Sequence, residues 1–351
     1  MTRLVWPARV AVGLLATAGM GLIATPAQAA STGVARVKDG SAIHYAAGNN
    51  ATNKVVVTRS GRVVTIDDRV PIRAGAGCAA AKNDRTKVRC TLKDTALWDK
   101  TLVVSLGNRS DSLVNRTAVS SLVRGGSGSD SLTGGSRNDE LHGESGKDRL
   151  VGRSGNDQLY GGTNADRLTG GGGVDSVNGN SGNDVLYGNS GNDLLNGGSG
   201  DDQQYAGTGN DQFWTWGPGT DGSDLMSGGS GRDSVKYVAR TLPIVVDLDG
   251  AKGDDGAKGE RDSVGADIED LFGGSGDDVL VGNGSANRLD GVLGNDRLYG
   301  GDGSDDLYGH AGNDFLSGED PTGDVPDRLD GNEDTDVCKA FAGDVKVNCE
   351  A

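Results

Sequence analysis

Aspartate recurs in this sequence at an interval regular enough to build a row of metal sites. If the chain is counted in nines from Gly125, residue six is aspartate in ten consecutive units. Two more units follow a four-residue insertion, and a second run of five begins at Gly273, with Asn287 replacing one aspartate. The aspartates at this position are Asp130, Asp139, Asp148, Asp157, Asp166, Asp175, Asp184, Asp193, Asp202, Asp211, Asp224, Asp233, Asp278, Asp296, Asp305 and Asp314. Carboxylates are the hard oxygen ligands that calcium and magnesium take in proteins.

The residues around each aspartate predict a short strand and a tight turn. Residue eight of the first ten units is apolar with one exception, and reads Leu132, Leu141, Leu150, Leu159, Leu168, Val177, Leu186, Leu195, Gln204 and Phe213. Because side chains alternate across a strand, this pattern predicts a three-residue strand with only its middle residue inward. Glycines at positions one, two and four permit the positive φ angles of a turn, and asparagine is the next most tolerant residue.

Two such units would close one coil, so the aspartates of every second unit would stack in a column, with one column on each of two opposite edges. Neighbouring coils would lie ~4.8 Å apart, as strands do in a sheet. Two carboxylates at this distance repel by about 1 kcal/mol in water and several-fold more near a protein surface. A cation between the coils would relieve this repulsion. Calcium fits a carbonyl-rich turn better than magnesium, which demands a stricter octahedron, and transition metals favour imidazole or thiolate.

The repeat resembles a known family. GGSGSDSLT (125–133) and GGSGDDVLV (273–281) match GGxGxDxUx, where U is a large apolar residue, the motif of RTX or haemolysin-type calcium-binding repeats. The resemblance implies an all-β fold, a parallel β-roll solenoid, with multiple calcium ions held between successive turns. It also implies that the ligands are the position-six aspartates together with carbonyl oxygens of the turns.

Three departures from the motif qualify this expectation. Asn287 stands where the repeat has aspartate, which predicts a weaker or lost site. Arg137 occupies a glycine position and Gln204 an apolar one, which predicts a looser stack at both places.

The amino-terminal segment 1–29 is typical of a secretory signal peptide. Arg3 and Arg9 accompany an apolar stretch from 10 to 23, and Ala27-Gln28-Ala29 offers a small-x-small cleavage site. The stretch is short for a spanning helix, so we expect cleavage and secretion to the extracellular space without membrane insertion, a membrane anchor being the alternative. The net charge of −16 and pI near 4.6 disfavour a nucleic-acid or anionic-membrane partner.

The repeats divide the rest of the chain. We expect a β-rich amino-terminal cap over 30–124, a first β-roll over 125–236, a joining segment over 237–272, a second β-roll over 273–337 and a disulfide-closed end over 338–351. Four cysteines in an exported protein favour disulfides. Of the three connectivities, the simplest joins the neighbours Cys78 with Cys90 and Cys338 with Cys349.

The function expected from these features is that of a secreted, non-catalytic calcium-binding protein whose repeats fold in response to calcium. Its other partner would be an extracellular matrix, envelope or cell-surface component. The alternative is an extracellular hydrolase or polysaccharide-acting enzyme with unrecognised catalytic residues in the cap, although the sequence contains no GxSxG or HExxH motif. A disordered acidic chain would not need strictly phased aspartates and leucines. An ice-binding surface would need a more regular outward column.

Overall fold

The computed structural model describes residues 32–93, 102–215, 222–318 and 325–350. The signal peptide expected over 1–29 and the inserted residues Trp216, Gly217 and Pro218 lie outside these ranges. The described residues form strands joined by turns and contain no helix, which confirms the all-β expectation. Accordingly, no described segment is a helix suited to crossing a membrane.

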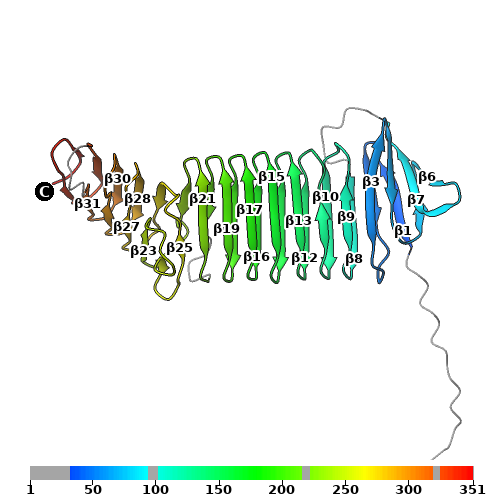
Figure 1. Cartoon of the computed structure of the whole chain (residues 1–351), viewed down its shortest axis with the longest axis horizontal. Coiled ribbons are helices and arrows are strands. Elements are labelled where there is room, and N and C mark those ends of the chain that lie inside the picture. The colour runs from blue at the N-terminus through cyan, green and yellow to red at the C-terminus, as the bar shows by residue number, and fades with distance from the viewer. Residues whose placement is uncertain (1–31, 94–101, 216–221, 319–324, 351) are drawn as a thin grey trace, which may run out of the picture. The chain divides into compact units, whose positions relative to one another are not determined.

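One sheet of sixteen strands runs from the cap through both blocks of repeats (Figure 1). In spatial order its strands are β5 (Ile72–Ala74), β1 (Gly33–Lys38), β2 (Ala42–Ala46), β8 (Leu102–Asn108), β10 (Ser121–Ser127), β12 (Glu140–Ser145), β14 (Gln158–Thr163), β16 (Ser176–Ser181), β18 (Leu194–Ser199), β20 (Gln212–Trp214), β22 (Ser234–Lys236), β26 (Asp270–Phe272), β28 (Arg288–Leu293), β30 (Asp306–Ala311), β32 (Arg328–Asn332) and β34 (Val345–Val347).

Two further sheets form the other side of the solenoid, one after the other. The twelve-stranded sheet contains β6 (Cys78–Ala81), β7 (Asp84–Thr91), β4 (Val63–Asp67), β3 (Lys54–Ser60), β9 (Ser112–Asn115), β11 (Ser131–Thr133), β13 (Arg149–Ser154), β15 (Arg167–Gly172), β17 (Val185–Ser190), β19 (Gln203–Thr208), β21 (Leu225–Ser230) and β25 (Ser263–Val264). The six-stranded sheet contains β24 (Gly256–Ala257), β23 (Ile244–Asp247), β27 (Val279–Val281), β29 (Arg297–Tyr299), β31 (Phe315–Ser317) and β33 (Val337–Lys339).

Parallel pairing of each strand with the strand two units further along the chain fixes the register of the repeats. Leu132 pairs with Leu150, and the row continues through Leu168 and Leu186. All four are fully buried between the two sheets, as their spacing predicts. Gln204 keeps its place in this row and is 1% exposed, so the expected loosening does not interrupt the pairing there.

Strands β12 to β19, β21, β28 and β30 have six residues instead of the predicted three, whereas β11, β20, β22, β27, β29 and β31 have the predicted length. β13 is typical: its six residues run from position seven of one unit to position three of the next. The residues at positions eight and one are both buried, Leu150 and Gly152 in this strand. The prediction missed the second half because glycine at position one carries no apolar side chain to reveal burial, while its backbone still spans the inward face.

The cap pairs differently from the roll. Its strand pairs β1–β2, β3–β4, β4–β7 and β6–β7 are antiparallel, and a turn at Gly61-Arg62 joins β3 to β4. β2 and β3 then pair in parallel with β8 and β9, which continues the two sheets into the roll. The disulfides have the predicted connectivity, Cys78–Cys90 and Cys338–Cys349.

Candidate metal sites at the turns

The sixteen predicted aspartates lie in the turns just before their strands, and all are buried, with exposed fractions between 0% and 4%. Hydrogen bonds join them into columns. The backbone N–H of Asp130 donates to Oδ1 of Asp148, whose own N–H donates to Oδ1 of Asp166, each at 2.7 Å. On the opposite edge Asp157 and Asp175 make the same contact at 2.8 Å. The predicted stacking on two edges is therefore present.

The second carboxylate oxygen has a different environment. In eleven of the sixteen aspartates Oδ2 is buried and accepts no hydrogen bond from any described residue. These are Asp130, Asp148, Asp157, Asp166, Asp175, Asp184, Asp193, Asp211, Asp233, Asp296 and Asp314. A buried carboxylate oxygen without a partner costs free energy, so a column of them indicates a site for a positively charged ligand.

A second oxygen converges on the same point from the next coil. A Cβ placed on Gly161 would lie 2.6 Å from Oδ2 of Asp166 and 2.7 Å from the carbonyl oxygen of Gly179, the equivalent glycine two units further along the chain. The glycine at position one therefore leaves open a space between a carboxylate oxygen and a carbonyl oxygen. Such a donor set fits calcium, which binds carboxylates and backbone carbonyls with flexible geometry.

The electrostatics of the columns agree with this fit. Burial, with a smaller contribution from the carboxylates on adjacent coils, raises the pKa of Asp157, Asp166 and Asp193 to about 7. The N–H donors from the preceding coil act in the opposite direction. These aspartates are difficult to ionise when no cation accompanies them, because a buried charge loses its hydration.

Three turns have a different conformation in which the turn satisfies its own side chain. The N–H of Gly135 donates to Oδ2 of Asp139 at 2.6 Å, and that of Gly274 to Oδ2 of Asp278 at 2.7 Å. In the third turn, Oδ1 of Asn287 accepts the N–H of Asn283 at 2.8 Å. In none of the three does position two have the positive φ seen in the regular turns. We call these the closed turns.

Each closed turn follows a coil that is not a nonapeptide repeat. The cap precedes the turn at Asp139, and the joining segment 237–272, called the insert below, precedes the turns at Asp278 and Asn287. The turn at Asp130 also follows the cap but is regular, and there the carbonyl groups of Gly107 and Arg109 lie against Gly126 and Gly128. Arg137, at a glycine position, lies in one of these closed turns, where positive φ is not required.

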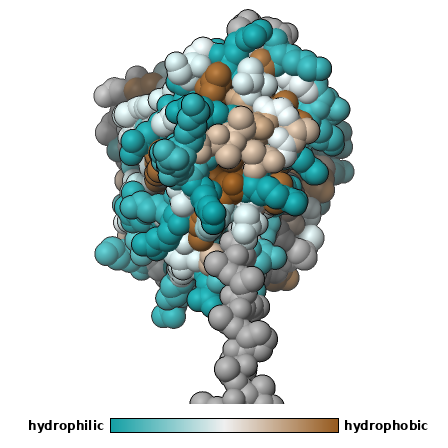
Figure 2. All heavy atoms as spheres, turned by 90° about the vertical axis from the view of Figure 1, so that its right-hand side faces the viewer, coloured by the Kyte–Doolittle hydropathy of each residue, from teal (hydrophilic) through white to brown (hydrophobic). Residues whose placement is uncertain are grey.

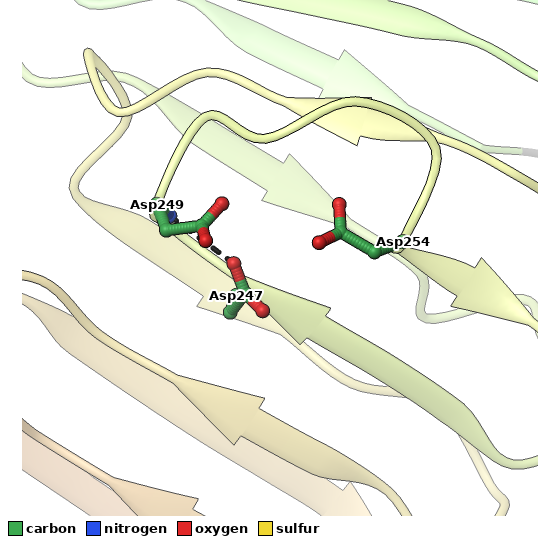
Figure 3. Close-up of side chains that lie close together, drawn as sticks. All are labelled: Asp247, Asp249 and Asp254. Carbon is green, nitrogen blue, oxygen red and sulfur yellow. Dashed lines mark hydrogen bonds between the residues drawn. The ribbon is translucent and has the colours of Figure 1, made fainter.

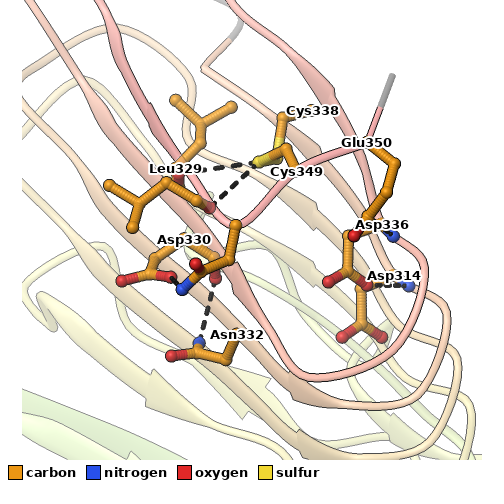
Figure 4. Close-up of a disulfide and its surroundings, with 10 residues drawn as sticks. Asp314, Leu329, Asp330, Asn332, Asp336, Cys338, Cys349 and Glu350 are labelled. Atoms are coloured by element: carbon orange, nitrogen blue, oxygen red, sulfur yellow. Dashed lines mark hydrogen bonds between the residues drawn. A yellow bond between two sulfur atoms is a disulfide. The ribbon is translucent and has the colours of Figure 1, made fainter.

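Residues that the period of nine does not reveal extend the columns. Asp224 donates its N–H to Oδ1 of Asp262 at 2.9 Å, and Asp233 donates its N–H to Oε2 of Glu269 at 2.8 Å. Asp262 and Glu269 thus take the place of position six although both belong to the joining segment 237–272 and not to a nonapeptide repeat. At the carboxyl end Glu350 accepts the N–H of Asp336 at 2.6 Å, beside the Cys338–Cys349 disulfide (Figure 4).

A second, exposed ladder runs along position five. Oδ1 of Asn138 accepts the N–H of Asn156, and Oδ1 of Asn156 accepts the N–H of Val174, both at 3.0 Å. Asp201 and Asn210 act in the same way for Ser223 and Arg232. The signal for this ladder was present in the frequent Asn-Asp pairs of the sequence, which the sequence-based interpretation did not use.

Other polar groups lie outside the columns. Asp247, Asp249 and Asp254 bring carboxylate oxygens within 4.8 Å of one another on the insert, and Asp249 donates its N–H to Asp247 (Figure 3). Exposed acidic groups of this kind are common without an ion, so we do not count them as a site. Nε2 of His142 lies 2.9 Å from Oε1 of Glu140, and Nε2 of His310 lies 3.0 Å from Oδ1 of Asp290.

Comparison with known proteins agrees with the geometry of the turns. The family described as RTX calcium-binding nonapeptide repeat (4 copies) matches residues 124–159, 151–186, 178–213, 218–236, 263–298 and 290–320. These segments contain all sixteen predicted aspartates and all three closed turns. No curated protein matches the chain significantly. The parallel β-roll described above is thus built from repeats that match the RTX calcium-binding nonapeptide family over residues 124–213, 218–236 and 263–320.

Proposed function

We propose that this protein is secreted, has no catalytic role, and uses its β-roll to bind several calcium ions between stacked turns, which couples calcium binding to folding. The observation that carries the proposal is the buried Oδ2 atom that accepts no hydrogen bond and recurs through the regular turns beside a carbonyl oxygen of the next coil. Calcium would supply the positive charge that these buried carboxylates require.

The proposed ligands are the predicted aspartates of the regular turns together with turn carbonyl oxygens. Asp139 and Asp278 differ from the others, since N–H groups already occupy both of their carboxylate oxygens. We therefore assign these two aspartates a weaker part in calcium binding than the rest. Asn287, with its amide nitrogen donating to the carbonyl of Glu269 at 3.1 Å, has no carboxylate to contribute.

Secretion is supported by the amino-terminal sequence, by the two disulfides and by the acidic, oxygen-rich turns, which suit the millimolar calcium found outside cells. A calcium titration of the mature chain, followed by circular dichroism with magnesium as the control, tests the proposal. We expect a cooperative gain of β signal that calcium produces and magnesium does not. An unchanged spectrum in a chain already folded after chelation would show that calcium is not the folding switch.

A further inference from the structure

The cap has a charge opposite to that of the whole chain. Residues 32–93 contain twelve lysines and arginines and four aspartates, a formal charge of +8, whereas the complete chain carries −16. The excess of negative charge therefore belongs to the roll, where the columns and their flanking acidic residues lie. The net negative charge of the whole chain disfavours anionic partners, but the positive charge of the cap favours them at this end of the protein.

Part of this positive charge gathers on the outer face of β1, β2 and β5. Arg36 on β1 pairs directly with His44 on β2, and Val34, two residues earlier on the same face, pairs with Arg73 on β5. These side chains line a hollow of about 350 Å³ that extends to Ser105 on β8. Its described lining residues include no carboxylate, so the hollow concentrates positive potential.

The two arginines have no internal counter-charge. Neither Arg36 nor Arg73 forms an ion pair with any residue in the described ranges. On the other sheet, by contrast, Lys87 lies 3.0 Å from Asp67 and 3.2 Å from Asp84. Long cationic side chains that are exposed and unpaired around a hollow are the usual means of holding an anion.

Arg73 also lines a second hollow of about 650 Å³, whose other charged lining residues are Arg85 and Asp84, and the Asp84 carboxylate is paired with Lys87 at 3.2 Å. The positive charge therefore follows a path across the end of the cap rather than a single point. Figure 2 shows hydrophilic side chains over most of this end of the molecule, around a smaller apolar area. A path of this kind fits a linear chain of negative charges better than one small anion.

The side chains of the cap distinguish between classes of polyanion. Tyr45 is the one aromatic residue in 32–93, and it is buried, with its hydroxyl donating to Asp68. Apart from the ring of His44, the described cap therefore exposes no aromatic ring on which bases could stack, and strands are the only elements that it could place in a groove. We propose that the outer face of the cap, at Arg36, His44 and Arg73, binds an anionic extracellular glycan.

The test is the affinity of the mature chain for heparin, as a sulfated glycan, in the presence of calcium. Arg36→Gln combined with Arg73→Gln removes the two arginines of the hollow. Arg149→Gln combined with Arg297→Gln removes the same charge from exposed positions on the roll and serves as the matched control. We expect the cap variant to bind about tenfold or more weakly and with a smaller dependence on salt, while the control binds as the wild type does.

Polygalacturonate, as a carboxylated glycan, neutral dextran and duplex DNA complete the set of probes. Binding to either charged glycan but not to dextran, and loss of that binding in the cap variant, supports the assignment. Equal binding by the two variants overturns it, as does tighter binding to DNA than to either glycan. The assignment is also overturned if the wild-type chain binds no glycan but self-associates in a salt-sensitive way that the cap variant loses. The surface would then bind a second copy of the chain. Calcium binding by the roll is measured separately, so its failure is distinguishable.

Discussion

Replacing one aspartate of a regular turn should change the stability of the calcium-free and calcium-bound forms in opposite directions. Asp166→Asn keeps the oxygen that accepts the N–H of Asp148 at 2.7 Å, so the column of hydrogen bonds survives. The substitution removes the charge of Oδ2, the atom that lies beside Gly161 and the carbonyl oxygen of Gly179. The variant therefore separates the ligand role of the carboxylate from its structural role.

The size of the effect follows from the electrostatics of the column. Burial, together with the carboxylates of Asp148 and Asp184, raises the pKa of Asp166 to about 7, whereas an ordinary aspartate titrates near 3.9. Keeping it ionised in the calcium-free fold costs up to about 4 kcal/mol, and on the order of 2 kcal/mol once water at the edge of the turn is allowed for. Asp166→Asn should stabilise the calcium-free form by about that amount at pH 8.

With calcium present the same variant should be less stable than the wild type and should bind at least one ion fewer. Urea unfolding with chelator and with calcium measures the two stabilities, and isothermal titration calorimetry measures the stoichiometry. Asp201→Asn is the matched control, since Asp201 is exposed and asparagine commonly fills its position in other units. The reasoning fails if Asp166→Asn leaves the number of bound calcium ions unchanged. It also fails if Asp166→Asn shifts the stabilities with chelator and with calcium in the same direction, or no more than Asp201→Asn does.

Three further predictions concern pH, the interior and the carboxyl end. Because the pKa values of the column aspartates are higher in the folded chain than in the unfolded chain, their contribution to stability is complete below about pH 4 and is lost as the pH rises through about 7. For each linked carboxyl, the free energy of unfolding of the calcium-free chain should fall by about 1.4 kcal/mol per pH unit in this range, so the urea midpoint should be higher at pH 5.5 than at pH 8. A higher midpoint at pH 8 would contradict the prediction. Gln204→Leu, which removes a buried Oε1 without a partner between Leu186 and Met226, should raise the free energy of unfolding by about 1–3 kcal/mol, and a lower melting temperature would refute this. Replacing Cys338 and Cys349 with serine opens a loop with a sequence separation of 11 and should cost about 3 kcal/mol, seen as earlier proteolysis of the last coil; unchanged protection of that coil would count against it.

Much of the roll could be predicted because its information is local and repeated. The spacing of Asp130, Asp139 and Asp148 set the length of the coil, and the row from Leu132 showed which residue faces inward. The disulfide pairing could also be proposed, because each cysteine has a partner about a dozen residues away.

What could not be predicted depends on neighbours that are distant in sequence. Asp262 and Glu269 complete the columns from 38 and 36 residues away, and both lie in a segment that does not carry the repeated sequence. The closed turn at Asp139 has a regular sequence apart from Arg137, and it follows a coil that is not a repeat. The basic character of the cap was likewise hidden, since the total charge averages it with a much larger acidic roll.

The aspartate columns have a single direction, opposite to that of the exposed ladder at position five, and this makes the two ends of the stack of coils chemically different. Each N–H donor belongs to the earlier coil, and each carboxylate acceptor belongs to the later one, from Asp111 and Asp130 onward. A folded coil therefore presents backbone N–H groups that can bind the aspartate carboxylate of the coil that follows it in the sequence. A chain that emerges amino terminus first can wind coil by coil behind the point of emergence. In the last described coil Glu350 accepts the N–H of Asp336 in one column, beside the Cys338–Cys349 disulfide, and Asp344 accepts the N–H of Asp327 in the other.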